Sequence, residues 1–165
     1  MNMKGVERLL VVTAIAATAL ASGTPAGAQV VFCSHGTSAQ VEDVSVLANP
    51  ARYFGWGLSL EILGTNSTWV HLPVTSLFGA KTRYLALVFE SAATQGVAVN
   101  RVDVWDGATK IKQFDVSWTG PRAEVLDLGA DHAFGSLGIS ARVVTDPDTA
   151  DHSITFSTAC AEYHF

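Results

Sequence analysis

Hydrophobic and polar positions alternate along much of the chain from residue 29 onward. In the clearest run, residues 53–63, every second residue is large and apolar: Phe54, Trp56, Leu58, Leu60 and Ile62. A period of two residues is that of a half-buried β-strand. The pattern predicts one strand over 53–63, with Trp56 in the core.

Further strands are expected where apolar runs are bounded by Gly, Pro, Asn or Asp. These runs are 29–33, 41–47, 68–74, 83–90, 97–106, 110–118, 123–128, 137–144 and 152–160. Pro73 cannot donate to a ladder, so its strand should lie at an edge or end there. Asn100 and Arg101 interrupt the alternation, which indicates a β-bulge, and Asp106-Gly107 is a hairpin signal.

No segment carries a sustained apolar period of 3.6 residues with helix caps. The spacing of short strands and turns is typical of an all-β fold. We therefore predict a single antiparallel β-sandwich of nine or ten strands.

The N-terminal segment has the features of a secretory signal. Lys4 and Arg8 flank the start of an apolar run over residues 9–21, and Ala26-Gly27-Ala28 fits a cleavage site before Gln29. We predict a cleaved signal peptide over 1–28, one domain over 29–165, and a secreted or periplasmic location.

The charge balance narrows the range of partners. Fifteen acidic residues against ten basic ones give a net charge of −5, and the chain has no basic cluster. Such a chain is a poor partner for nucleic acid or anionic lipid. No second apolar run approaches the ~18 residues of a membrane helix, so no stable membrane insertion is expected.

The two cysteines, Cys33 and Cys160, lie near the ends of the predicted domain. In an oxidising compartment an even pair usually bonds, so we predict a disulfide between them. Two buried free thiols are the alternative.

Catalytic and metal-binding motifs are missing from the sequence. There is no G-x-S-x-G elbow, phosphate loop or dinucleotide fingerprint, so no catalytic residue and no cofactor are expected. The five histidines lack metal-ligand spacing: His35, His71, His132, His152 and His164. No metal site is expected, although Asp146, Asp148 and Asp151 form a weak calcium candidate whose alternative is a solvated turn.

Two tryptophans fall opposite the apolar positions of their strands. Trp69 lies opposite Val70 and Leu72 and near His71, and Trp105 precedes Asp106. Exposed indole rings stack on flat or apolar ligands, whereas buried ones fill the core. We take Trp69, His71, Trp105 and Asp106 as the candidate ligand-binding residues.

Four segments resemble a family of small bacterial proteins classed as a domain of unknown function. They are FGWG (54–57), NSTWVHLPV (66–74), VDVWDGATKIKQFD (102–115) and ITFSTACAEYHF (154–165). The resemblance implies a compact β-sandwich and supplies no reaction or cofactor. The family's aromatic-His-Pro segment matches Trp69, His71 and Pro73, and its Trp-Asp-Gly turn matches 105–107.

These observations favour a secreted, non-enzymatic β-sandwich with a binding or structural role in assembly. The partner would be an extracellular glycan or protein. The alternatives are a small outer-membrane β-barrel and an uncharacterised extracellular hydrolase. Asn66 begins an N-glycosylation sequon, which matters only in a host that glycosylates.

Overall fold

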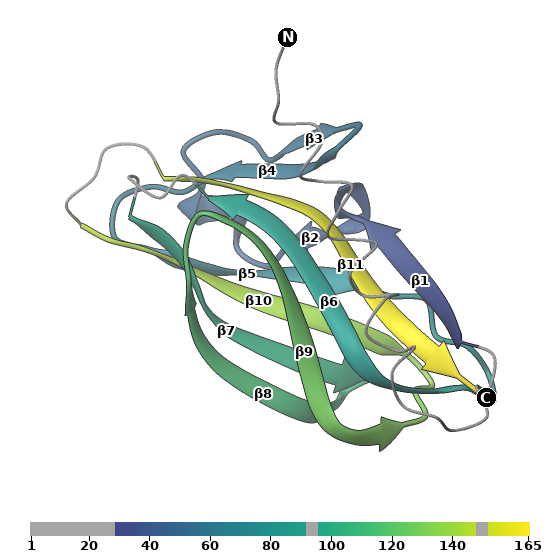
Figure 1. The fold of residues 1–165 in the computed structure, drawn as a ribbon. Helices are drawn as coiled ribbons and strands as arrows, with labels where there is room; N and C mark the ends of the chain where they lie inside the picture. The colour runs from purple at the N-terminus through teal and green to yellow at the C-terminus, as the bar shows by residue number, and fades with distance from the viewer. Residues whose placement is uncertain (1–28, 92–95, 148–151) are drawn as a thin grey trace, which may run out of the picture.

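The computed structural model describes residues 29–91, 96–147 and 152–165, and these form two antiparallel sheets packed face to face (Figure 1). The first sheet contains β1 (Gln29–His35), β3 (Arg52–Phe54), β4 (Gly57–Glu61), β6 (Lys81–Ser91), β9 (Pro121–His132) and β11 (Ser153–His164). The second contains β2 (Gln40–Val41), β5 (Ser67–Pro73), β7 (Val97–Asp106), β8 (Thr109–Trp118) and β10 (Leu137–Thr145). The predicted all-β sandwich is confirmed, with eleven strands in this part of the chain rather than nine or ten.

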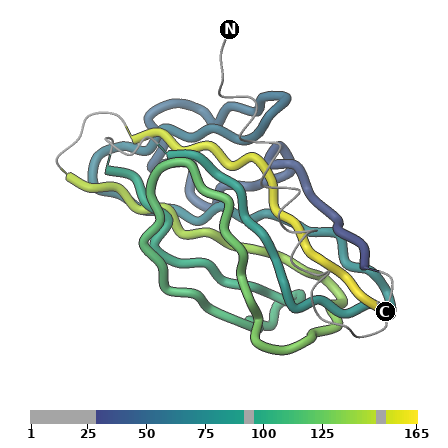
Figure 2. The backbone as a smooth tube through the Cα atoms, in the orientation of Figure 1, coloured from purple at the N-terminus to yellow at the C-terminus, as the bar shows by residue number. Residues whose placement is uncertain are grey.

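The strand order places distant segments side by side. The first sheet runs β3-β4-β11-β6-β9, with β1 also paired to β11, and the second runs β2-β5-β10-β7-β8. One end of the sandwich carries both the start of β1 and the end of the chain, since Gln29 pairs with His164. Figure 2 shows this convergence along the backbone.

The core lies between the two sheets and is built from the alternate apolar residues of each strand. On β10 the buried apolar residues are Leu137, Ile139, Ala141 and Val143, and on β6 they include Leu85, Leu87 and Phe89. Removing these side chains from water is the main driving force for pairing the sheets. Tyr163 is fully buried, and its hydroxyl donates to the carbonyl of Thr75 at 2.7 Å.

Several local predictions are confirmed. Strand β5 ends at Pro73, and β7 turns into β8 after Asp106 through Gly107, whose φ is 56°. In the β10–β7 register Arg142 pairs with Arg101 and Val143 with Val99, so Asn100 is the extra residue of a bulge. The bulge turns Arg101 outward and returns the following valines to the core.

Two strand predictions are wrong. Residues 53–63 form a hairpin, β3 and β4, that turns through Gly55 and Trp56. Trp56 is therefore 51% exposed rather than in the core, and it stacks on Phe54 with ring centroids 4.7 Å apart. Residues 41–47 contain only the end of β2, because the carboxylate of Asp43 caps a 3-10 turn over Val44–Val46 by accepting from the N–H of Ser45.

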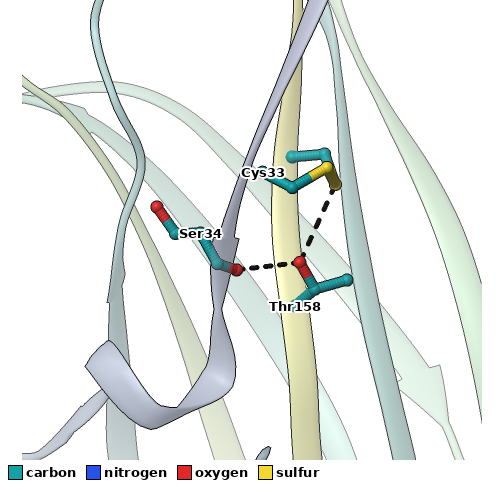
Figure 3. The surroundings of a disulfide bond; sticks show 4 residues. Cys33, Ser34 and Thr158 are labelled. Carbon is teal, nitrogen blue, oxygen red and sulfur yellow. Dashed lines mark hydrogen bonds between the residues drawn. A yellow bond between two sulfur atoms is a disulfide. The ribbon is translucent and has the colours of Figure 1, made fainter. Parts of the chain in front are cut away.

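The predicted disulfide is present between Cys33 and Cys160, which face each other across β1 and β11. Beside it the Thr158 hydroxyl donates to the carbonyl of Ser34 at 2.8 Å (Figure 3). The bond fixes the first described strand to the last one.

The predicted signal peptide, residues 1–28, lies outside the described residues. Over the part of the chain that the structure describes, no helix is long and apolar enough to cross a membrane.

Candidate functional site

The outer face of the β2-β5-β10-β7-β8 sheet carries most of the polar chemistry of interest. Because alternate residues of β10 are buried, Gly138, Ser140 and Arg142 point outward. Each one is flanked by a residue of β5 and a residue of β7. Gly138 lies between Pro73 and Trp105, Ser140 between His71 and Asp103, and Arg142 between Trp69 and Arg101.

An open groove of about 490 Å³ runs over this face. Its floor is β10, where Gly138 has no side chain and Ser140 has a small one. One wall is Trp105 with the turn at Gly107, and the other wall is formed by β5 and β2, with His71 and Gln40 among its residues. The groove exists because small residues on the middle strand lie between large ones on its neighbours.

His71 is held on its wall by contacts on both sides of its ring. Its Nδ1 is hydrogen-bonded to the hydroxyl of Ser140 at 2.8 Å, and its Nε2 lies 3.6 Å from a carboxylate oxygen of Glu42. Ser140 is buried, whereas the imidazole remains accessible from the groove. The contacts fix the orientation of a ring that can donate to or accept from a ligand.

Asp106 acts on the loop that follows β9. Its Oδ1 accepts from the backbone N–H groups of Gly135 at 3.0 Å and Ser136 at 2.8 Å, and its Oδ2 lies 3.4 Å from Nε2 of His132. The hydrogen bond from Ser136 is the largest cause that lowers the pKa of Asp106 below its ordinary value. The carboxylate thus holds the loop that contributes Ser136 to the groove.

A buried carboxylate organises the rest of this face. Asp103 is only 2% exposed although it points outward, because two cations lie against it. Arg101 donates to it through Nε at 2.8 Å and Nη2 at 2.7 Å, and the Nζ of Lys110 lies 3.7 Å away. These hydrogen bonds raise the pKa of the Arg101 guanidinium further above its ordinary value.

The same two cations lie over the two outward-facing tryptophans. The guanidinium of Arg101 is 5.4 Å from the ring centre of Trp69, and the ammonium of Lys110 is 5.9 Å from that of Trp105. Both distances are within the range of cation–π attraction. Asp103 therefore contacts both cations that lie over the tryptophan rings.

The four predicted ligand-binding residues are distributed unevenly around this site. His71 and Trp105 line the groove from opposite walls. Trp69 lies farther along the same face, and Asp106 lies beside the groove as a support for its loop. Sequence reasoning missed Gln40, Asp103 and Ser140. The outward alternation on β10 could have identified Ser140, and opposite charges two residues apart on β7 could have identified Asp103.

The calcium candidate falls largely outside the described residues, since Asp148 and Asp151 are not among them. Asp146 is described, and its backbone N–H donates to the carbonyl of Gly96 at 2.7 Å. Within the described ranges, no group of three or more His, Cys, Asp or Glu residues is placed to hold a metal ion.

Comparison with known proteins gives distant structural similarities alone. No protein-family model and no curated protein matches the chain. Among solved structures, a family 36 carbohydrate-binding module in complex with calcium and xylotriose is 15% identical, covering 77% of this chain and 96% of that one, with a TM-score of 0.43. The family 61 module TmCBM61, in complex with beta-1,4-galactotriose, is 15% identical over 82% and 88%, with a TM-score of 0.46.

A family 35 carbohydrate-binding module from Clostridium thermocellum is 12% identical, covering 80% of this chain and 97% of that one, with a TM-score of 0.45. Similarities this distant do not transfer a ligand from those modules to this protein.

Proposed function

We propose that this protein is a non-enzymatic binding protein that holds a carbohydrate in the groove over β10. One arrangement carries the proposal: the indole of Trp105 lines the same open groove as the imidazole of His71 and the amide of Gln40. A sugar ring has apolar C–H faces and a rim of hydroxyl groups. The apolar face suits an indole, and the rim suits amide, imidazole and hydroxyl groups that can both donate and accept hydrogen bonds.

The open shape of the groove also favours this ligand. Small-molecule sites usually enclose most of their ligand in a largely apolar cavity. Here the floor is flat backbone with Gly138 and Ser140, and the groove is open to solvent along its length. Such a surface suits a polysaccharide whose sugar units lie side by side along the groove. It suits a compact ligand that must be enclosed less well.

The contacts of His71 with Ser140 and Glu42 invite comparison with a catalytic triad, but the surroundings favour binding. Ser140 lies inside β10, which is hydrogen-bonded to β5 on one side and β7 on the other. The backbone N–H groups around it are therefore committed to the sheet and are unsuited to an oxyanion hole. We accordingly assign the Ser140 hydroxyl to positioning His71.

We place the protein in an oxidising, extracytoplasmic compartment. The Cys33–Cys160 disulfide supports this location, because such bonds persist outside the reducing cytoplasm. The location also agrees with the signal peptide predicted over residues 1–28.

Native gel electrophoresis in the presence of polysaccharides tests the proposal. Mobility of the wild type is compared with that of Trp105→Ala across neutral and acidic polymers. Trp56→Ala is the matched control, because Trp56 is also an accessible indole but belongs to the β3–β4 hairpin of the other sheet. We expect the polymer to retard the wild type and Trp56→Ala, and we expect Trp105→Ala to lose affinity about fivefold to 150-fold, which corresponds to about 1–3 kcal/mol for an aromatic anchor.

If no polymer slows the migration of the wild type, the carbohydrate assignment is overturned. Loss in Trp56→Ala with retention in Trp105→Ala would move the site to the hairpin. Melting temperatures of all three proteins establish that the variants are folded.

A further inference from the structure

The Lys110 ammonium lies beside the aromatic wall of the groove. It lies 5.9 Å from the ring centre of Trp105, and its side chain is 37% exposed. Its polar contacts are the Gln113 side-chain oxygen at 3.2 Å and the Asp103 carboxylate at 3.7 Å. Because Arg101 already binds both oxygens of that carboxylate, the charge of Lys110 is only partly compensated.

The other carboxylates near this face lie away from Trp105 or are already engaged. Glu42 follows β2, which lies three strands from β7, or about 14 Å at the usual spacing between strands. Asp115 is five residues beyond Lys110 along β8, opposite Arg101. Asp106 is occupied by the backbone of the loop at Gly135 and Ser136. A ligand ring against Trp105 therefore lies beside an ammonium group whose charge is only partly compensated.

This arrangement discriminates between neutral and anionic ligands. A neutral ring that stacks on Trp105 displaces the ammonium from the indole and gives it no new charged partner. A sugar ring that bears a carboxylate or sulfate also displaces the Lys110 ammonium from the indole. In return, its anionic group accepts a charge-assisted hydrogen bond from that ammonium. The second exchange is favourable because Lys110 has a flexible side chain that can swing from the ring face to its rim.

We infer that the groove is selective for acidic saccharides, whose sugar ring stacks on Trp105 while its anionic group pairs with Lys110. The inference rests on the proposed carbohydrate function and adds the class of sugar. Two further cationic side chains lie on the same face: Arg142 on β10 and Arg101 on β7, which are directly opposite each other. Within the described residues Arg142 has the Ser67 hydroxyl as its side-chain partner, at 3.3 Å.

The test uses polymer pairs that differ only in charge: alginate with its carboxyl-reduced form, and a sulfated galactan with its desulfated form. Dissociation constants are measured for the wild type, Lys110→Gln, Lys110→Arg and Lys81→Gln. Lys81→Gln removes the same charge from the exposed start of β6 in the other sheet. Melting temperatures verify that each variant is folded.

We expect the wild type to bind at least one acidic polymer about tenfold or more tightly than its neutral partner, the ratio that one charge-assisted hydrogen bond provides. Lys110→Gln should abolish this ratio, while Lys110→Arg and Lys81→Gln keep it. The pair that shows the difference identifies carboxylate or sulfate as the recognised group.

Equal binding of charged and neutral polymers by the wild type, with loss in Trp105→Ala, would overturn the inference and leave the carbohydrate function standing. Equal losses in Lys110→Gln and Lys81→Gln would overturn it as well, because net charge alone would then explain the preference. Binding of no polymer would overturn both the inference and the proposed function.

Discussion

The Arg101 guanidinium and the Asp103 carboxylate form a two-point ion pair within one strand, with Nε–Oδ1 and Nη2–Oδ2 distances of 2.8 and 2.7 Å. The residues are two positions apart on β7, so both point to the outer face of the sheet. The pair is asymmetric, because the side chain of Arg101 is 30% exposed and that of Asp103 only 3%. This asymmetry predicts different costs for removing each partner.

Arg101→Met should destabilise the protein more than Asp103→Asn does. The first change leaves a buried carboxylate with Lys110 as its remaining cation, at 3.7 Å, and a buried charge that has lost its main partner is strongly destabilising. The second leaves a guanidinium that water can reach. Urea denaturation of the two variants and of the double variant measures the difference. Equal losses in both single variants would contradict the asymmetry.

Asp127 gives the first sheet a pH-dependent contribution to stability. Hydrogen bonds from Arg83 at 2.7 and 2.8 Å are the main cause that lowers the pKa of Asp127 from 3.8 to about 2. A carboxylate with a lowered pKa stabilises the fold above its unfolded-state pKa and loses that contribution as pH falls through the folded-state value. The relevant window is therefore about pH 4 to pH 2.

Asp127→Asn should have a lower melting temperature than the wild type at neutral pH. The difference should shrink as pH falls from about 4 to about 2, because the wild-type carboxylate becomes protonated there. Thermal unfolding across this range measures it. A difference that is constant with pH would mean that the pair does not contribute through its charge.

Asp106→Ala should affect ligand binding more than folding. The change frees the N–H groups of Gly135 and Ser136, which lie at the surface where water can replace the carboxylate. We expect a small loss of stability and a larger proportional loss of affinity, since Ser136 would no longer be fixed at the groove. Calorimetric binding and urea titration of the same variant separate the two effects. Full affinity would exclude a role for this loop.

The Cys33–Cys160 disulfide should stabilise the domain without being required for the fold. It closes a sequence separation of 127 residues, for which chain entropy alone predicts about 4–5 kcal/mol as an upper value. Cys33→Ser/Cys160→Ser should therefore melt at a lower temperature but keep a β-rich circular dichroism spectrum. Reductant should lower the melting temperature of the wild type and leave that of the double variant unchanged. A double variant with no ordered structure would show that β1 and β11 depend on the bond.

Local signals in the sequence were sufficient where the structure depends on neighbouring residues. Asp106-Gly107 indicated the β7–β8 hairpin, and the slipped alternation at Asn100 indicated the bulge. The β3–β4 hairpin was missed because the apolar alternation of the sequence runs unbroken through the turn at Gly55 and Trp56, although the pairing of Phe54 with Gly57 puts Phe54 on the opposite face from Leu58. Period alone cannot separate these cases, and the exposure of Trp56 follows from the turn.

The groove depends on contacts that no local pattern contains. His71 and Ser140 are 69 positions apart, and they meet because β5 pairs with β10. Trp105 reaches the same groove from β7 on the other side of β10. The sequence could indicate that Trp105 and His71 point outward from their strands. It could not indicate that Gly138 leaves a floor between them, because the strand order was unknown.

Gly138→Val is the most direct test of the proposed binding site, because it adds a side chain to the floor of the groove. No heavy atom lies within 4 Å of a Cβ built at Gly138, and valine favours strands. Gly55→Val is the matched control, since its added Cβ also meets no atom within 4 Å, but at the β3–β4 turn. The measurement is the dissociation constant for the polysaccharide that the wild type binds, together with the melting temperature of each variant. We predict that Gly138→Val keeps or raises its melting temperature and loses at least tenfold in affinity, while Gly55→Val retains wild-type affinity. Wild-type affinity in a folded Gly138→Val protein would contradict the assignment of the groove as the binding site.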